Sequence, residues 1–103
     1  MIRVSIDPVG MTFRLDGHAG YAPEGQDIVC AGASMLAAAL FEYVLCMTDE
    51  DALGECEMEP GHAALDVYTA DADAAQRCRT AFHMAAMGFE LLAARYPDHV
   101  IID

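Results

Sequence analysis

The chain has 103 residues, enough for one domain, because two domains would each be too small to bury a workable core. Hydrophobic residues make up 55% of the sequence, so we expect a folded protein rather than a disordered one. The formal net charge is -12, and the five basic residues are all arginines spread along the chain. We therefore expect no direct binding to nucleic acid, which needs clustered lysine and arginine, and an acidic protein of this kind favours a basic partner.

The pattern of the first half predicts two strands, a loop and a helix. Apolar and polar residues alternate over residues 2–7 and again over 11–15, which predicts a hairpin of half-buried strands. Residues 17–26 contain three glycines and one proline, so they are expected to form a loop. Asp27 is a good N-cap for a helix over residues 28–47. That helix is apolar on nearly all sides, so we expect it to be buried against a sheet.

The second half predicts two more strands, a second helix and a short final strand. The strands cover residues 53–58 and 63–69 and are joined by a turn at Pro60-Gly61. The helix opens at about residue 71 and runs to about residue 95, and the last strand covers 100–102. The order is therefore strand–strand–helix–strand–strand–helix–strand. This order predicts a single α+β domain in which two helices pack on one mixed β-sheet.

The second predicted helix carries an apolar row beyond its main apolar stripe. The row consists of Met84, Met87 and Leu91. Two interpretations stay open, because such a row either covers the sheet more widely or forms a contact between two copies of the chain.

Neither a secretion signal nor a membrane span is expected. The first residues lack a basic start followed by a long apolar run. The richest apolar stretch, residues 28–47, contains Ser34 and Glu42 and has a helical pattern. The four cysteines, at positions 30, 46, 56 and 78, have no paired spacing, so we expect reduced thiols in a cytoplasmic protein.

One histidine and one cysteine have a spacing that suggests nucleophilic catalysis. His18 begins the loop within Gly17-His18-Ala19, and Cys30 lies in the first turn of the predicted helix. Backbone N–H groups at a helix start are unpaired and the helix dipole favours an anion there, so we expect a larger thiolate fraction at Cys30. A flexible loop can bring the imidazole of His18 beside this thiol, which is the minimal pair for acyl transfer. Free N–H groups at the helix start are candidates for binding the oxyanion.

Each of these residues also has a simpler interpretation. Cys30 fits a small buried side chain, and His18 fits a strand-end residue bonded to the loop backbone. Asp27 is best interpreted as a helix cap. Its second interpretation is as the third residue of a catalytic triad, in which it orients His18. The main alternative is therefore an interaction domain with an inert, buried Cys30. A metal site of His18, Cys30 and either His62 or His99 lacks the close ligand pair of structural zinc, so we expect no metal and no cofactor.

The region around these residues resembles the ribosomal-processing cysteine protease family, Prp. That family has a Gly-His-Ala element, a glycine-rich loop and then Gly-x-Asp-Ile-Val-Cys-Ala with a nearby serine. This chain has Gly17-His18-Ala19 and then Gly25-Gln26-Asp27-Ile28-Val29-Cys30-Ala31, followed by Ser34. The order of predicted elements agrees along the rest of the chain.

The resemblance implies a function and a set of residues. It implies that Cys30 and His18 are the catalytic pair, with Asp27 in a supporting role. It implies cleavage of the N-terminal extension of large ribosomal subunit protein twenty-seven, a homodimer, and a mobile loop that covers the substrate. Within that loop we expect Gly20, Tyr21 and Gly25 to contribute to substrate binding, together with Ser34 in the helix. Under this resemblance the non-catalytic alternative becomes a dimeric, ribosome-associated domain.

The chain departs from the family pattern directly after Cys30-Ala31. The family usually has Ala-Val-Ser there, whereas this chain has Gly32-Ala33-Ser34. We expect Gly32 to leave space beside the nucleophile and widen the floor of the substrate site. Ser34 either lines that floor or bonds back to the helix backbone.

Overall fold

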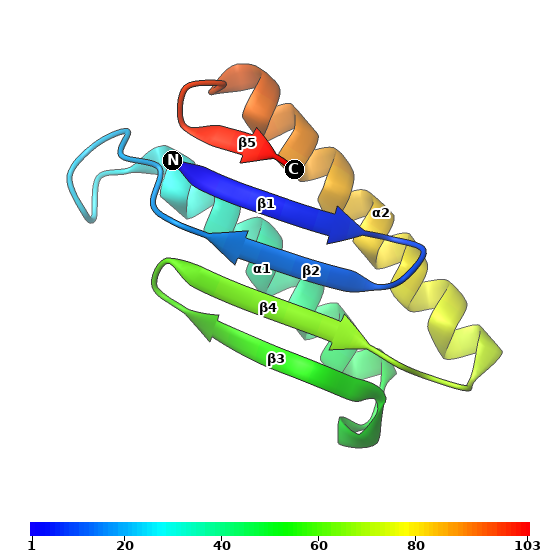
Figure 1. Ribbon diagram of the computed structural model, residues 1–103. Helices are drawn as coiled ribbons and strands as arrows, with labels where there is room; N and C mark the ends of the chain where they lie inside the picture. Colours follow the sequence, from blue (N-terminus) through cyan, green and yellow to red (C-terminus); the bar gives the residue numbers. More distant parts are fainter.

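The computed structural model describes residues 1–103 and has the predicted element order. Two helices cover one face of a five-stranded sheet, which confirms the predicted α+β class (Figure 1). A short 3₁₀ helix, η1, which the sequence did not predict, follows the first long helix. The elements are β1 Ile2–Asp7, β2 Thr12–Asp16, α1 Ile28–Met47, η1 Glu50–Ala52, β3 Leu53–Glu59, β4 His62–Val67, α2 Ala72–Arg95 and β5 Val100–Ile102.

Five strand boundaries differ from the prediction by one or two residues, and two of these differences have clear local reasons. Met11 has a φ of 55°, in the left-handed region, so it closes the turn after β1 and the strand begins at Thr12. The fourth strand ends at Val67 because the N–H of Tyr68 leaves the sheet and donates to the carbonyl oxygen of Ala52 in η1.

The sheet has the strand order β3-β4-β2-β1-β5. β1 and β5 run parallel and the other pairs run antiparallel, so the sheet is mixed, as predicted. The start of α1, the loop of residues 17–26 and the turn between β3 and β4 lie at the same end of this sheet (Figure 1). The topology therefore gathers segments from both halves of the chain at one end of the molecule.

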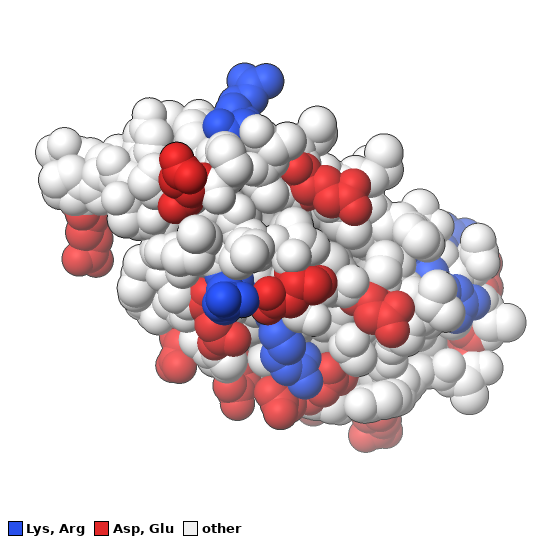
Figure 2. Space-filling model, turned by 45° about the horizontal axis from the view of Figure 1, so that its top comes forward, with Lys and Arg blue, Asp and Glu red and all other residues white.

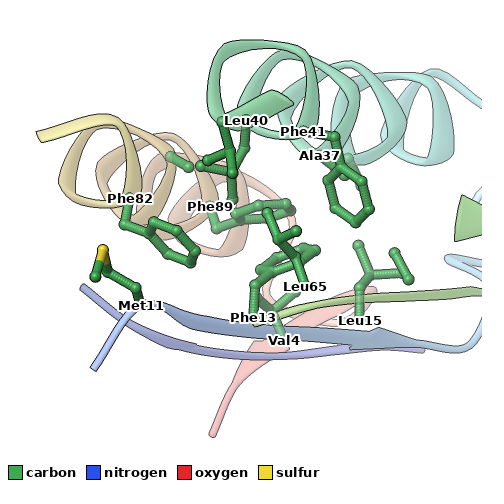
Figure 3. Close-up of a cluster of buried hydrophobic side chains, with 14 of the residues drawn as sticks. Val4, Met11, Phe13, Leu15, Ala37, Leu40, Phe41, Leu65, Phe82 and Phe89 are labelled. Atoms are coloured by element: carbon green, nitrogen blue, oxygen red, sulfur yellow. The ribbon is translucent and has the colours of Figure 1, made fainter. Parts of the chain in front are cut away.

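The core lies between the sheet and the two helices. Val4, Phe13 and Leu65 project from neighbouring strands toward the helices and have no exposed surface (Figure 3). The ring of Phe13 lies 5.5 Å from that of Phe89 in α2 and 6.2 Å, edge-on, from that of Phe41 in α1. Such close-packed aromatic contacts hold both helices in register with the strands, giving a rigid platform for the ends of these elements.

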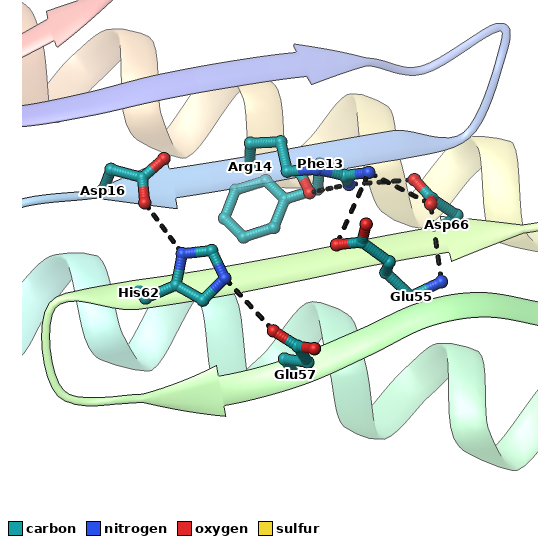
Figure 4. Close-up of polar contacts among 7 residues, drawn as sticks. All are labelled: Phe13, Arg14, Asp16, Glu55, Glu57, His62 and Asp66. Carbon is teal, nitrogen blue, oxygen red and sulfur yellow. Dashed lines mark hydrogen bonds and ion pairs between the residues drawn. The ribbon is translucent and has the colours of Figure 1, made fainter.

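The opposite face of the sheet carries polar side chains that tie the strands together (Figure 4). Arg14 donates two hydrogen bonds to the buried carboxylate of Asp66, at 2.8 and 3.0 Å, and these bonds lower the pKa of Asp66. His62 lies 2.7 Å from an oxygen of Asp16 and 3.3 Å from one of Glu57, and the bond with Asp16 raises the pKa of His62. These contacts fix the hairpin of β3 and β4 against β2.

Glycines allow the two helices to approach each other. A Cβ atom at Gly32 would lie 3.5 Å from Leu92, and one at Gly88 would lie 2.5 Å from Leu36. Gly32 therefore faces α2 and does not line the cleft described below. The expected widening of the substrate site by Gly32 is wrong, because the side of α1 that carries Gly32 is turned away from that cleft.

The apolar row of the second helix does not cover the sheet. Met84, Met87 and Leu91 are 74%, 64% and 72% exposed. α2 packs on the sheet through another side than the one that carries this row. The buried residues of that side are spaced at helical intervals. They are Ala75, Cys78, Phe82, Ala85 and Phe89.

By length and composition alone, α1 is apolar enough to span a membrane, contrary to the expectation from sequence. A single such helix is weak evidence, because the core helix of a soluble protein passes the same test. Here α1 buries one side in the protein, through Val29, Ala33, Ala37, Leu40, Phe41 and Val44.

Candidate active site

A cleft of about 780 Å³ opens at one end of the sheet. Its walls come from the loop of residues 17–26, the first turns of α1 and the turn between β3 and β4. The structure brings most of the predicted site residues together here. The cleft is lined by His18, Gly20, Gly25, Asp27, Cys30 and Ser34, among others.

Cys30 lies in the first turn of α1, and Asp27 caps this helix as predicted. One carboxylate oxygen of Asp27 accepts hydrogen bonds from the N–H groups of Val29, at 3.0 Å, and Cys30, at 2.9 Å. The side chain of Cys30 is half-buried and lines the cleft. The N–H of Ala19 donates to its Sγ atom at 3.3 Å. The interpretation of Cys30 as a fully buried side chain is therefore wrong.

The other carboxylate oxygen of Asp27 holds the loop. It accepts hydrogen bonds from the N–H groups of Tyr21, at 2.9 Å, and Ala22, at 3.3 Å. These hydrogen bonds hold the pKa of Asp27 below its ordinary value. The bond from the Cys30 N–H has the largest effect, and the bonds from Tyr21, Ala22 and Val29 have smaller ones. Both oxygens are thus occupied by backbone donors and none bonds to His18. In this structure Asp27 is a helix cap and a loop anchor.

His18 lies against the turn between β3 and β4. The N–H of Gly17 donates to the carbonyl oxygen of Gly61 at 2.9 Å, which joins the start of the loop to this turn. A Cβ atom at Gly61 would lie 2.6 Å from Nε2 of His18, so the imidazole occupies the space that a side chain at Gly61 would need. His18 and Cys30 line the same cleft without a direct hydrogen bond, and catalytic hydrogen bonds often form only when substrate is bound.

Three of the N–H groups expected for the oxyanion site at the start of α1 are already paired. Those of Val29 and Cys30 donate to the side chain of Asp27, and that of Ala31 donates to the Asp27 carbonyl oxygen at 3.0 Å. The N–H of Ala19, directed at the sulfur of Cys30, is the backbone donor that faces the candidate nucleophile. The sequence analysis missed it because Ala19 belongs to the loop and not to the helix.

Tyr21 is the one predicted substrate contact that does not line the cleft. Its ring packs edge-on against the rings of Tyr96 and His99, with centroids 5.4 Å apart in both cases. These contacts turn the ring of Tyr21 toward the C-terminal turn. Gly20 and Gly25 do line the cleft, and both have a positive φ, of 66° and 85°, that favours glycine.

The candidate metal ligands do not form a coordination site. No group of three His, Cys, Asp or Glu side chains is placed to hold a metal ion. His62 also lines the cleft, but its ring nitrogens are paired with Asp16 and Glu57. His99 bonds to the carbonyl oxygen of Ala19.

The chain matches one protein family along nearly its whole length. The family model of cysteine protease Prp matches residues 1–101. The chain belongs to the Prp family. It is therefore a cysteine protease, and the predicted resemblance is confirmed.

One curated relative and two solved structures are similar to this Prp chain. A ribosomal processing cysteine protease Prp from Bacillus subtilis (strain 168) is 25% identical over 100 residues, which cover 96% of this chain and 89% of that one. The S. aureus ribosomal processing protease Prp, in complex with a covalently linked product peptide, superposes with a TM-score of 0.78 at 19% identity, covering 99% of this chain and 95% of that chain. SMU.848 from Streptococcus mutans superposes with a TM-score of 0.74 at 25% identity, covering 100% of this chain and 92% of that chain.

Besides the Ala19 N–H, the sequence analysis missed two contacts that support the candidate site. Gly61 was predicted only as part of a turn, and nothing near it in sequence indicates that the turn supports His18. His99 lies 80 positions from its partner Ala19, so no local pattern connects them. Both contacts arise from the topology, which places the turn and the C-terminal segment beside the loop.

Replacing Asp27 tests the two roles of its carboxylate. We expect Asp27→Ala to lower both Tm and kcat/KM, because it removes the cap and releases Tyr21 and Ala22. Asp27→Asn keeps one acceptor oxygen for the cap, so it should retain most of the Tm while kcat/KM falls with the loosened loop. Asp71→Ala is the matched control, since Asp71 caps α2 through Ala74 and should lower Tm alone.

The lowered pKa of Asp27 sets the sign of the pH effect. The carboxylate contributes stability above the pKa that it has in the unfolded chain, and this contribution is lost as the pH falls through its lower folded pKa. The difference in Tm between wild type and Asp27→Ala should therefore shrink as the solution is acidified. Full wild-type activity in Asp27→Ala would contradict the role as loop anchor.

Proposed function

We propose that this protease removes the N-terminal extension of large ribosomal subunit protein twenty-seven, with Cys30 as nucleophile and His18 as general base and acid. One observation carries the proposal: the two side chains line one cleft, from separate segments, with the Ala19 N–H directed at the sulfur. Membership of a cysteine protease family makes a cysteine in this cleft the natural nucleophile.

The reaction proceeds through an acyl-enzyme. The Cys30 thiolate attacks the carbonyl carbon of the scissile peptide bond, forming a C–S bond and a tetrahedral oxyanion. As the C–N bond breaks, the imidazolium of His18 gives its proton to the leaving amine. A water molecule then gives a proton to His18 and attacks the thioester, which releases the carboxylate product and restores Cys30.

The relatives and the surface charge support the choice of substrate. The Bacillus subtilis relative is a ribosomal processing protease, and the S. aureus protease has been crystallised with a substrate peptide and with a product peptide. Acidic side chains are scattered over the face shown in Figure 2, and its few basic ones form no continuous patch. This charge favours association with a basic ribosomal protein and disfavours nucleic acid. Action on such a protein implies a cytoplasmic location.

Incubation with a peptide that spans the extension and the first mature residues of the ribosomal protein tests this function. We expect one cut at the junction, identified by mass spectrometry. If neither the peptide nor the whole ribosomal protein is cut, the substrate assignment is overturned.

Thiol labelling tests the role of Cys30 without any substrate. Cys46 and Cys56 are exposed, Cys30 is half-buried and Cys78 is buried, where desolvation raises the pKa of its thiol. Accessibility alone would make the two exposed cysteines react first. An activated nucleophile should instead make Cys30 react with iodoacetamide faster than the other three. Labelling in order of exposure would favour the non-catalytic interaction domain.

We also propose that two copies of the chain associate through the outer face of the helices. Met84, Met87 and Leu91 form an exposed apolar row on α2, and Met35 on the neighbouring α1 is 68% exposed. Large apolar side chains gathered in this way are typical of interaction sites. We expect sedimentation equilibrium to give a dimer and Met84→Glu to give monomers. Val9→Glu, at an equally exposed position in the turn after β1, should leave the dimer intact.

A further inference from the structure

The C-terminal turn of the chain packs against the loop that carries His18. Nδ1 of His99 lies 2.8 Å from the carbonyl oxygen of Ala19. A carbonyl oxygen only accepts hydrogen bonds, so Nδ1 carries the proton and donates it. His99 is itself half-buried and does not line the cleft. Nδ1 of His99 therefore bonds to the loop of residues 17–26.

Ala19 connects His99 to the candidate nucleophile. Its carbonyl oxygen accepts from His99, and its own N–H donates to Sγ of Cys30 at 3.3 Å. The side chain of Ala19 is buried, so the residue is held by packing as well as by these two bonds. An N–H group directed at the sulfur stabilises the thiolate, because hydrogen bonds to a charged acceptor are stronger than those to a neutral one. A displacement of Ala19 would withdraw this donor.

The ring of His99 makes a second contact, on the other side of Gly20. It packs edge-on against the ring of Tyr21 at 5.4 Å, and Tyr21 also packs against Tyr96. His99 thus holds the residue before Gly20 through a hydrogen bond and the residue after it through an aromatic contact. These two contacts can be removed separately by substitution.

We propose that His99 is a positioning residue of this protease: it fixes Ala19 so that the Ala19 N–H is directed at the sulfur of Cys30. His99 touches neither the substrate nor the reacting atoms. The inference rests on the proposed role of Cys30 as nucleophile, and it is independent of which protein is cleaved.

Two substitutions of His99 separate the hydrogen bond from the aromatic contact. His99→Asn places an amide nitrogen near the position of Nδ1 and keeps the donor, while His99→Phe keeps a ring beside Tyr21 and has no donor. The readouts are the rate of iodoacetamide labelling at each cysteine and the kcat and KM for an extension peptide. We expect His99→Phe to lower the Cys30 labelling rate and kcat about tenfold, as for the loss of one hydrogen bond, with little change in KM. His99→Asn should keep the wild-type rates.

Internal and matched controls accompany this comparison. Labelling of the exposed Cys46 and Cys56 should not change in either variant. His83 lies on the exposed side of α2, so His83→Phe and His83→Asn should behave as wild type. Thermal melting checks the fold of every variant. If His99→Phe does not fold, His99→Gln replaces it, because its amide nitrogen corresponds to Nε2 and leaves Ala19 without a donor.

The outcomes are distinct. A wild-type rate of Cys30 labelling in a folded variant without the donor would overturn the proposal. An equal loss of labelling rate in His99→Asn would also overturn it, because the effect would then be assigned to the aromatic contact. A wild-type protein that leaves the ribosomal peptide intact would count against the proposed substrate only, because the labelling comparison does not involve substrate.

Discussion

Cys30→Ala is expected to abolish peptide cleavage while leaving the fold intact. The substitution removes the sulfur that forms the acyl-enzyme, and loss of a nucleophile of this kind lowers kcat by on the order of 10⁴-fold or more. Cys30 is half-buried, so the change removes little core packing and Tm should move by only a few degrees. Hydrolysis of the extension peptide and thermal melting measure the two effects. Cys46→Ala, at an exposed cysteine of the same helix, should keep full activity.

His18→Ala should be as inactive as Cys30→Ala, and the double variant should be no worse than either. A nucleophile and its base act as one unit, so their effects on the rate do not add. His18→Ala should also remove the preferential labelling of Cys30, because the imidazole no longer assists ionisation of the thiol. Cleavage at the wild-type rate in either single variant would contradict the proposed pair. A labelling preference that survives in His18→Ala would show that the helix start and the Ala19 N–H activate the sulfur by themselves.

The fold could be predicted, and the candidate catalytic pair could be proposed, because their signals are local. Alternating residues mark β1 and β2, and Asp27 marks the start of α1 by its position before an apolar helical run. The motif around His18 and Cys30 then predicts the pairing, and the structure brings both residues to one cleft. The second function of Asp27 could not be predicted, because its other oxygen binds Tyr21 and Ala22 only after the loop has folded back.

The parts that could not be predicted depend on contacts between distant segments. The strand order β3-β4-β2-β1-β5 follows from strand pairing that no local pattern encodes. The side of α1 on which Gly32 lies depends on where α2 packs, and the orientation of Tyr21 depends on Tyr96 and His99. The same distant contacts support the active site. The sequence therefore indicates which residues form the candidate site. Their geometry depends on how the β3–β4 turn and the C-terminal turn pack against the loop of residues 17–26.

Gly61→Ala is the sharpest test of that support. Gly61 has a φ of 78°, and its added Cβ would lie 2.6 Å from Nε2 of His18 and 3.0 Å from Cε1. The substitution therefore strains the backbone and displaces the imidazole. A misplaced catalytic group can cost on the order of 100-fold, and we expect a loss of this size in kcat for the extension peptide. A wild-type kcat in a folded Gly61→Ala variant would show that the turn does not position His18.

Chemical denaturation separates the strain of the backbone from the collision with His18. Gly20 also has a left-handed conformation, with φ of 66°, but a Cβ there would have open space, so Gly20→Ala should cost about 1 kcal/mol from backbone strain alone. Gly61→Ala should cost more than this in the wild type, because it adds the collision. In the His18→Ala background the imidazole is gone, so the cost of Gly61→Ala should fall to about that of Gly20→Ala. The difference between the two backgrounds is the coupling free energy of Gly61 and His18, expected at roughly 0.5–3 kcal/mol for side chains in contact. An equal cost in both backgrounds, together with a wild-type kcat in Gly61→Ala, would mean that the turn tolerates a methyl group without moving His18, and that the imidazole is held by the loop alone.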